Sequence, residues 1–425
     1  MSYTDSVRYL YSLGNELKAG AKFGLERIEA LLAGLGNPQS GQRFVHVAGT
    51  NGKGSTCAII ASILRRAGVR TGLYTSPHLI EPTERIQING EDVSANQFAA
   101  AFHIVHSAAE ELIREGRVDA HPSYFETVTA MALLIFRERT QISVIEVGLG
   151  GRLDATNIIT PELCVITPVS YDHEAYLGNS LEAIAKEKAG ILKPGIPVVL
   201  ARQESVAEAV ITGRADELLC PVIRTEHADV QVTEFNAIGS KFRLDGEQYE
   251  CPLPGRHQIE NATAAILACR ALTVPLTAIQ AGMREVRWPG RLERVSRDPD
   301  FVLDGAHNPA GAAALARYIE EFCANRPVWL VYGAMRDKAL EEVTEHLFPL
   351  AQRLILTSPD FPRALRAEVI LEMTNHPHAT LTKTVAEAIA VAKEARRETI
   401  VFFTGSLYLV GEVRKLLVSS NVPVS

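Results

Sequence analysis

The chain has 425 residues, of which 47% are hydrophobic and 22% are charged, a balance typical of a globular protein with two or three domains. Its net charge of −7 argues against general binding to nucleic acids or to anionic membranes. The sequence has no run of about 18 uncharged apolar residues and no basic, apolar leader, so we expect neither a membrane span nor secretion.

Cysteine usage indicates the compartment. The six cysteines show no CxxC spacing and lie mostly in apolar runs, at Cys57, Cys164, Cys220, Cys251, Cys269 and Cys323. This is typical of buried thiols in a reducing compartment. We therefore expect a cytoplasmic protein, and we expect a monomer because the sequence shows no coiled-coil heptads.

Two helices are predicted before the first strand. Apolar residues at helical spacing indicate helices over residues 2–13 and 25–35, the first of them capped by Thr4 or Asp5. The segment between them, Gly14 to Gly24, is punctuated by glycines and is predicted to be a loop.

The segment Phe44–Thr56 (FVHVAGTNGKGST) combines a strand, a glycine-rich turn and the start of an apolar helix. This layout binds phosphate, because small residues let successive N–H groups point inward and the helix N-terminus adds positive potential. Lys53 supplies a point charge, and Ser55 or Thr56 supplies a hydroxyl for magnesium. The match to the general P-loop is incomplete, since Val47 occupies the first glycine position and an extra glycine follows the lysine. A phosphate-binding turn is favoured over a tight turn with a surface lysine.

Strands and helices alternate through the rest of the first half of the chain. The alternation predicts a mostly parallel, doubly wound sheet, whose ligands lie beyond the C-terminal ends of the strands. The P-loop, Ser76 and Glu146 would meet there, as would the pair Asp172–His173. The expected helices span residues 94–115, 123–139, 180–193, 257–272 and 276–286, and further strands are expected at 142–151, 162–174 and 196–202.

The pattern changes twice in the second half. Residues 228–253 contain short alternating segments and turns, which predict a small antiparallel patch. The segment WPGRLERVS (288–296) is predicted to be a hinge into a second unit, where alternation of strands and helices restarts. That unit is Rossmann-like but lacks GxGxxG, so no dinucleotide is expected.

Nine segments together resemble one family, the folylpolyglutamate synthases and dihydrofolate synthases of the Mur-ligase superfamily. They occur in family order across nearly the whole chain, and the extra glycine after the P-loop lysine resembles the family's own version. The segments are GTNGKGS (49–55), TSPH (75–78), VIEVGLGGRLDATN (144–157), DHEAYLG (172–178), AKEKAGILK (185–193), HQIENA (257–262), WPGRLE (288–293), LDGAHNP (303–309) and TGSLYL (404–409).

The resemblance implies two domains. Residues 1–290 would form a P-loop ATPase domain, a doubly wound and mostly parallel sheet that includes the pterin-binding loop and the antiparallel patch. Residues 291–425 would form a C-terminal, Rossmann-like glutamate-ligase domain.

The resemblance also implies an ATP- and magnesium-dependent ligase that adds L-glutamate to dihydropteroate and to folates through an acyl phosphate. ATP is needed because a carboxylate anion repels nucleophiles and has no good leaving group. The implied cofactors are ATP and two magnesium ions, with a monovalent cation as a further candidate, and the partners are small-molecule substrates.

Three alternatives stay open. A bifunctional enzyme is favoured over a monofunctional folylpolyglutamate synthase. A peptidoglycan ligase is disfavoured, because no UDP-sugar domain precedes the P-loop strand. The alternative from another class is a P-loop NTPase switch or motor that binds a partner, although the sequence shows no basic surface or helicase motifs.

Metal ligands follow from the resemblance. Residues matching Ser55, Ser76 and Glu146 bind one magnesium ion in the family, and those matching His173 and Lys188 serve a second. Lys188 would be carbamylated, which turns a cation into an anionic oxygen ligand. The alternatives are a solvated acid at Glu146, a structural histidine at His173 and an exposed helix-face lysine at Lys188. An acid that closes a strand as apolar as ISVI is costly unless it is paired, which favours the metal site for Glu146.

The resemblance assigns the nucleotide to Asn261, Arg291 and Asp304 and to the P-loop, with Asp304 closing the second domain onto the first. The P-loop residues concerned are Gly49, Thr50, Asn51, Gly52, Lys53, Gly54, Ser55 and Thr56. The implied catalytic residues are Lys53, His173, Lys188, Asp304 and His307.

Substrate contacts are implied in two places. Gly24 and Leu25 would flank the pterin together with Phe125, Asp154 and Ala155, because a stacked ring and a carboxylate suit a flat heterocycle with N–H donors. The incoming glutamate would meet His307, Ser406 and Tyr408. The alternatives are a core aromatic at Phe125 and helix caps or strand-end packing at the three glutamate positions. The histidine pairs His103/His106 and His376/His378 are expected to be solvated or core residues.

Overall fold

The structure, a computed structural model, describes residues 1–14, 24–336 and 339–418. Its contacts divide the chain into two compact units. Unit 1 comprises Met1–Val169, Leu177–Asp229 and Glu260–Glu285, and unit 2 comprises Ser170–Tyr176, Val230–Ile259 and Val286–Ser425. The predicted boundary between residues 290 and 291 stays a prediction. Most of the predicted loop from Gly14 to Gly24 lies outside the described residues.

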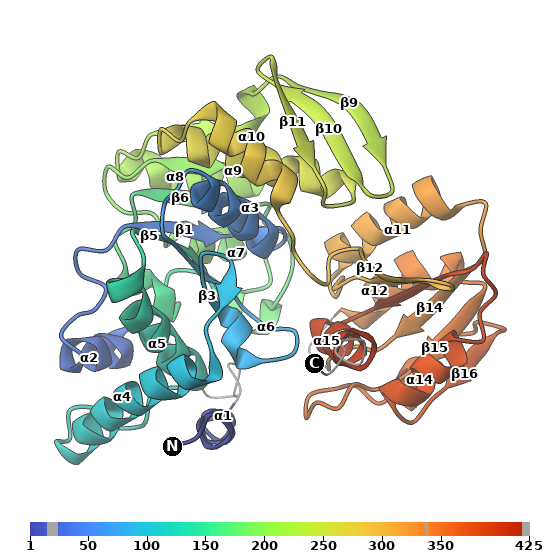
Figure 1. Cartoon of the computed structure of the whole chain (residues 1–425), viewed down its shortest axis with the longest axis horizontal. Coiled ribbons are helices and arrows are strands. Elements are labelled where there is room, and N and C mark those ends of the chain that lie inside the picture. The colour runs from blue at the N-terminus through green and yellow to red at the C-terminus, as the bar shows by residue number, and fades with distance from the viewer. Residues whose placement is uncertain (15–23, 337–338, 419–425) are drawn as a thin grey trace. The chain divides into compact units, whose positions relative to one another are not determined.

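Eight strands form the sheet of unit 1 among the described residues (Figure 1). They are β1 (Phe44–Ala48), β2 (Thr71–Tyr74), β3 (Ile86–Ile88), β4 (Glu91–Asp92), β5 (Ile142–Glu146), β6 (Leu163–Ile166), β7 (Val198–Leu200) and β8 (Val222–Arg224). Their order is β4-β3-β2-β5-β1-β6-β7-β8. The strands from β2 to β8 in this order run parallel, and β3 and β4 form an antiparallel edge.

Helices cover both faces of this sheet. The helices assigned wholly to unit 1 are α1 (Tyr3–Ser12), α2 (Glu26–Gly34), α3 (Lys53–Arg66), α4 (Ala95–Arg114), α5 (Tyr124–Arg139), α7 (Leu181–Ala189), α8 (Ser205–Glu217) and α10 (Leu276–Glu285). Helices α6 (Glu174–Leu177) and α9 (Arg256–Ala271) include residues of both units. The short 3₁₀ turns are η1 (Pro82–Arg85), η2 (Ala155–Ile158) and η3 (Thr225–His227).

Side chains alternate between the two faces of the sheet along β1, so each face packs against different helices. Phe44 packs in one core with α4 and α5, and Ala48 packs in another with α7 and α8. Because alternate side chains of a strand point to opposite faces, Val45 and Val47 face the other side, where α3 contacts β1 and α10 packs on α3. Every residue of β1 is buried, as expected of a parallel strand with helices on both faces.

Unit 2 contains two sheets among its described residues. The smaller one is antiparallel and consists of β9 (Val230–Asn236), β10 (Gly239–Leu244) and β11 (Glu247–Cys251). The larger one has the order β12-β13-β17-β14-β15-β16 and is parallel apart from its β12 edge. Its strands are β12 (Glu293–Arg297), β13 (Asp300–Leu303), β14 (Val328–Tyr332), β15 (Arg353–Leu356), β16 (Ala379–Leu381) and β17 (Ile400–Thr404).

Helices also flank the larger sheet of unit 2. They are α11 (Pro309–Cys323), α12 (Leu340–Leu347), α13 (Ala367–Glu372), α14 (Val385–Ala392) and α15 (Leu407–Leu417), with a 3₁₀ turn η4 (Phe348–Leu350). Side chains of α11, α12 and α13 share a buried core with β14 and β15. The smaller sheet joins that core through Ala237, whose carbonyl accepts a hydrogen bond from the hydroxyl of Tyr318 at 2.8 Å.

The fold confirms the predicted α/β class with a mostly parallel sheet, an antiparallel patch and a second α/β unit. Several local expectations were wrong. The strands expected at 142–151 and 162–174 are β5 and β6, which end at Glu146 and Ile166 because glycines and a proline follow them. The first helix is capped by Ser2 rather than by Thr4 or Asp5, because the Ser2 side chain accepts the Asp5 N–H. Part of the predicted hinge is the edge strand β12, paired antiparallel with β13.

The six cysteines are buried, as the apolar runs around them predict. Among the described residues, every helix is too short or too polar to span a lipid bilayer.

Candidate active site

The turn between β1 and α3 is a close-fitting glycine cradle in unit 1. Gly49 and Gly52 have φ values of 142° and 87°, which side-chain-bearing residues rarely adopt. A Cβ atom on Gly49 would lie 1.9 Å from Oγ1 of Thr167, and one on Gly52 would lie 2.1 Å from Oδ1 of Asn261. Only glycine fits at either position, and Asn261 on α9 lies directly against the P-loop.

Neighbouring groups fix the shape of this loop. The carbonyl of Pro168, just after β6, accepts hydrogen bonds from the N–H groups of Thr50 at 3.0 Å and Asn51 at 3.3 Å. The amine of Lys53 donates to the carbonyls of Gly49 at 3.2 Å and Thr50 at 3.0 Å. The positive charge of Lys53 is therefore held at the loop, where an anionic phosphate would bind.

Glu146 ends the strand next to β1. It is paired in register with Val47, two residues before the P-loop, and only 4% of it is exposed. Its Oε2 accepts the N–H of Ser76, which follows the neighbouring strand β2, at 3.1 Å. Ser55 is buried in the first turn of α3. Three adjacent strands thus bring carboxylate and hydroxyl oxygens to one edge of the sheet, and such donors suit magnesium.

Lys188 joins α7 to the same loop. It is 4% exposed, and its Nζ donates to the carbonyl of Gly49 at 2.8 Å. The lysine is therefore not an exposed residue of the helix face. The structure brings together the P-loop, Ser76, Glu146, Lys188 and Asn261 within unit 1.

The predicted pterin residues gather around the loop that follows β5. Phe125 lies against Gly148, where a Cβ would be 2.4 Å from the ring Cζ, and packs on Tyr74 with ring centres 6.0 Å apart. Asp154 accepts the N–H of Leu149 at 2.8 Å through Oδ2 and that of Thr156 at 3.0 Å through Oδ1. Burial raises the pKa of Asp154 to about 6, although these hydrogen bonds oppose the shift. Both of its oxygens therefore hold the loop together.

Three further residues are predicted to contact the pterin. Ala155 is buried at the start of η2. Leu25 stands at the N-cap of α2 without a side-chain capping bond, and Gly24 precedes it. The rest of the predicted loop, residues 15–23, lies outside the described residues.

Arg291 and Asp304 meet at the C-terminal end of β13 in unit 2. Asp304 is buried, and its two oxygens accept the N–H groups of Leu292 and Ala306, both at 3.0 Å. Burial raises the pKa of Asp304, and the nearby guanidinium of Arg291 opposes that shift. The same guanidinium lies so close to Gly305 that a Cβ there would be 2.2 Å from it. Asp304 thus fixes the turn that carries Arg291.

Two histidines share the carboxylate of Asp172 in unit 2. Nε2 of His307 lies 3.7 Å from Asp172 Oδ2, and Nε2 of His173 lies 3.8 Å from Oδ1. Asn308, the N-cap of α11, donates to Asp172 Oδ2 at 3.2 Å. His173 has a φ of +53°, an uncommon conformation for a residue with a side chain. Asp172, which was predicted with His173 at the edge of the first sheet, therefore brings His173 and His307 together, and the pair Asp172–His173 belongs to unit 2.

Ser406 and Tyr408 lie at the start of α15, next to the segment that follows β13. The N–H of Gly405 donates to the carbonyl of Ala306 at 3.0 Å, so the ends of β13 and β17 adjoin. Ser406 is buried and its hydroxyl caps α15 by accepting the N–H of Leu409 at 3.0 Å. The ring of Tyr408 stacks on Phe361 with centres 3.9 Å apart. Both side chains have structural contacts, and their predicted role toward glutamate stays a prediction.

Sequence reasoning missed one group that shapes these sites. Thr167 and Pro168 close the P-loop just after β6. A signal was available, since these two residues follow the apolar run LCVI and the carboxyl ends of parallel strands face the ligand side of a sheet.

The chain matches known proteins along nearly its full length. The profile of the Mur ligase middle domain matches residues 47–269, and that of the Mur ligase glutamate ligase domain matches residues 290–407. The chain is 36% identical over 432 residues to the dihydrofolate synthase/folylpolyglutamate synthase of Bacillus subtilis, which covers 98% of this chain and 99% of that relative.

Solved structures are similar to this chain over nearly its full length as well. The folylpolyglutamate synthase of Mycobacterium tuberculosis complexed with ADP and AMPPCP superposes with a TM-score of 0.89 at 31% identity, covering 98% of this chain and 99% of the other. Escherichia coli FolC in complex with DHPP and ADP superposes with a TM-score of 0.87 at 31% identity, covering 98% of each chain. Together with the glycine cradle and the buried acid beside it, these matches show that the chain belongs to the folylpolyglutamate synthase/dihydrofolate synthase family of the Mur-ligase superfamily, as an ATP-dependent amide-forming ligase.

Proposed function

We propose that this enzyme adds L-glutamate both to dihydropteroate and to reduced folate, through an acyl phosphate formed with ATP. The observation that carries the proposal is the edge of the unit 1 sheet, where the glycine cradle, Lys53 and the buried Glu146 converge. The end-to-end similarity to enzymes named for both activities supports the substrate class.

The cradle fits the phosphates of ATP. Its two glycines allow a close approach of the backbone, and the N-terminus of α3 and the Lys53 amine supply positive potential. Phosphoryl transfer from ATP to a carboxylate joins two anions, so positioning and charge neutralisation dominate the chemistry. Lys53 and the first turn of α3 would orient the phosphates against the substrate carboxylate.

The oxygen-rich edge of the sheet fits magnesium. Glu146 and Ser76, with Ser55 from α3, would hold one ion, which supplies charge neutralisation for the β- and γ-phosphates when bound. A carbamylated Lys188 in unit 1 would serve the second ion, and the predicted role of His173, which belongs to unit 2, stays a prediction. Lys188 is already buried against the P-loop, and carbamylation would give an oxygen ligand in place of its amine. An intact-mass measurement of the native enzyme tests this modification.

We assign the remaining predicted residues by what they contact. Asn261, which lies against the P-loop in unit 1, would bind the nucleotide. Arg291, fixed by the Asp304 turn in unit 2, stays a predicted nucleotide contact. His307, oriented through the carbonyl of Gly305 at 2.7 Å, would meet the incoming glutamate, near Ser406 and Tyr408. Phe125, with the Asp154–Ala155 turn and Gly24–Leu25, would form the pterin end. We infer a monomer, and light scattering of the purified enzyme tests that state.

The decisive experiment offers two acceptors in parallel. The enzyme with ATP, magnesium and L-glutamate receives either dihydropteroate or tetrahydrofolate, and mass spectrometry follows the product that gains one glutamyl residue. We expect product from both acceptors. Product from tetrahydrofolate alone would make the enzyme a monofunctional folylpolyglutamate synthase, and product from neither would contradict the proposal.

A further inference from the structure

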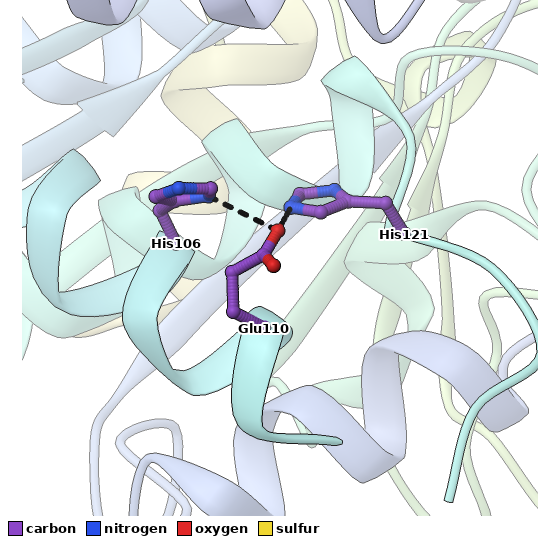
Figure 2. A group of neighbouring side chains, drawn as sticks. All are labelled: His106, Glu110 and His121. Carbon is purple, nitrogen blue, oxygen red and sulfur yellow. Dashed lines mark ion pairs between the residues drawn. The ribbon is translucent and has the colours of Figure 1, made fainter. Parts of the chain in front are cut away.

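A cluster of metal-binding side chains lies outside the proposed active site. His106 and Glu110 are on α4, and His121 is in the segment that leads from α4 to α5 (Figure 2). All three side chains point toward one another, with the Glu110 carboxylate between the two rings. Nδ1 of His106 lies 3.9 Å from Glu110 Oε1, and Nε2 of His121 lies 3.8 Å from the same oxygen.

We propose that His106, Glu110 and His121 form a binding site for a divalent transition-metal ion of the zinc class, which fastens α4 to the segment that leads into α5. Two imidazole nitrogens and a carboxylate are a common donor set for zinc. The three candidate ligand atoms lie within 4.8 Å of one another. A common point therefore lies about 2.5 Å or less from each, close to zinc–ligand bonds of ~2.0–2.2 Å.

The two ring nitrogens that face Glu110 are the strongest evidence. Nδ1 of His106 and Nε2 of His121 are buried and have no hydrogen-bond partner among the described residues. Buried polar nitrogens without partners are unusual, because each loses its hydration without compensation. Burial also lowers the pKa of His106, which favours the neutral ring that a metal requires. A bound cation would give both nitrogens a partner.

The surroundings also resemble those of a metal site. The other nitrogen of His121, Nδ1, is 2.9 Å from the carbonyl of Pro122. Metal-bound histidines usually donate their second N–H in this way, which fixes the tautomer and orients the free nitrogen. The hydroxyl of Tyr9 donates to Glu110 Oε1 at 3.4 Å, and the Tyr9 ring packs on both histidines. The Pro122 carbonyl and Tyr9 therefore hold the side chains of this cluster in place.

Solvent can reach the site through its acid. The Glu110 side chain is 54% exposed, whereas those of His106 and His121 are 15% and 13% exposed. A metal ion could enter past the carboxylate and keep a water molecule as its fourth ligand. Glu146 of the proposed active site, in contrast, accepts the N–H of Ser76, and the predicted ligands Ser55 and Ser76 would add hydroxyl oxygens, a donor set that suits magnesium.

The test uses tag-free, full-length protein stripped of metal, with excess magnesium and without nucleotide, so that the hard-oxygen site does not compete. Cobalt binding is followed by its visible absorption, and zinc affinity is then measured by displacement. We expect the wild-type protein to bind one more equivalent of zinc than His106→Gln or His121→Gln. Each substitution should weaken zinc binding by at least ~10–100-fold, which is the effect of removing a residue that only hydrogen-bonds to a metal ligand.

Two controls keep the result interpretable. His378→Gln alters an exposed histidine that neighbours His376 in unit 2 and should bind zinc like the wild type. X-ray absorption of the zinc-loaded wild-type protein needs no variant, and it should show nitrogen and oxygen ligands with imidazole scattering and no sulfur. Equal zinc binding by wild type and both histidine variants, or sulfur in the first shell, would overturn the proposal.

Discussion

A chain of buried polar groups links β1 to the loop behind the candidate site. Nε2 of His46 lies 2.9 Å from Oγ1 of Thr156, and that hydroxyl donates to Asp154 at 2.5 Å. His46 is fully buried, and burial, reinforced by nearby Lys193, lowers its pKa to about 3. The polar side chain inside a strand of otherwise apolar residues thus anchors the turn that carries Asp154 and Ala155.

This arrangement predicts acid sensitivity. The folded-state pKa of His46 lies below its unfolded value of 6.5, so only the unfolded chain gains a proton as the pH falls from 6.5 toward 3. The contribution of neutral His46 to the free energy of unfolding is fully present above pH 6.5. Below pH 6.5 it is lost by ~1.4 kcal/mol per pH unit. Between pH 7 and pH 5, His46 should therefore lower the free energy of unfolding by ~2 kcal/mol.

Urea unfolding of the wild type and of His46→Gln at both pH values tests this. Glutamine can keep the bond to Thr156 but does not titrate, so the variant should lose ~2 kcal/mol less than the wild type on acidification. Equal losses in the two proteins would show that His46 is not the responsible group.

Gly49 makes a second prediction at the residue scale. Gly49→Ala would place a methyl group against the Thr167 hydroxyl and carbonyl, which forces the P-loop out of shape. We expect nucleotide affinity to fall on the order of 100-fold, equivalent to ~3 kcal/mol. Gly41→Ala is the matched control, because Gly41 also has a positive φ but meets no atom within 4 Å.

The control should cost ~1–2 kcal/mol of stability and leave nucleotide affinity unchanged. Isothermal titration with a non-hydrolysable ATP analogue measures the affinities, and chemical denaturation measures the stabilities. If Gly49→Ala binds nucleotide as the wild type does, the cradle is not the phosphate site.

At the scale of the elements, local sequence signals located most helices and strands but not all their ends. The capping serines Ser94 and Ser123 start α4 and α5 within a residue of the predicted bounds, because a cap acts through neighbouring residues only. The edge strand β12 was taken for a hinge. Its pairing with β13 depends on a partner in the fold, which local pattern cannot show.

An ion pair between two helices could not be predicted for the same reason. Arg27 of α2 donates to both oxygens of Glu126 on α5, at 3.1 and 2.9 Å, although 99 residues separate them in sequence. Their side chains are 23% and 7% exposed. Removing one partner leaves a poorly solvated charge.

We predict that Glu126→Gln lowers the free energy of unfolding by ~3–5 kcal/mol. The exposed pair Arg43–Glu162, with side chains 55% and 40% exposed, provides the comparison. Glu162→Gln should cost no more than ~1 kcal/mol. Urea denaturation of both variants gives the two values, and similar costs would mean that burial does not distinguish the pairs.

At the scale of the whole molecule, the sequence predicted the sheet edge better than the interior of the site. Parallel strands must end together, so the P-loop, Ser76 and Glu146 could be grouped from spacing alone. The reach of Lys188 to the Gly49 carbonyl and the shared use of Asp172 by two histidines depend on side-chain packing between distant segments. The bipartite fold and the family were predicted correctly because their motifs extend along the chain.

We propose that the sheet edge of unit 1 couples ATP cleavage to amide formation. Steady-state phosphate release, measured with ATP alone, with ATP and folate, and with ATP, folate and glutamate, tests it most directly. We predict sustained release only with all three substrates, and a loss of ~10²–10³-fold in Glu146→Gln, the scale of losing one electrostatic contact to the transition state. Sustained release without glutamate, or an unchanged rate in Glu146→Gln, would contradict the account.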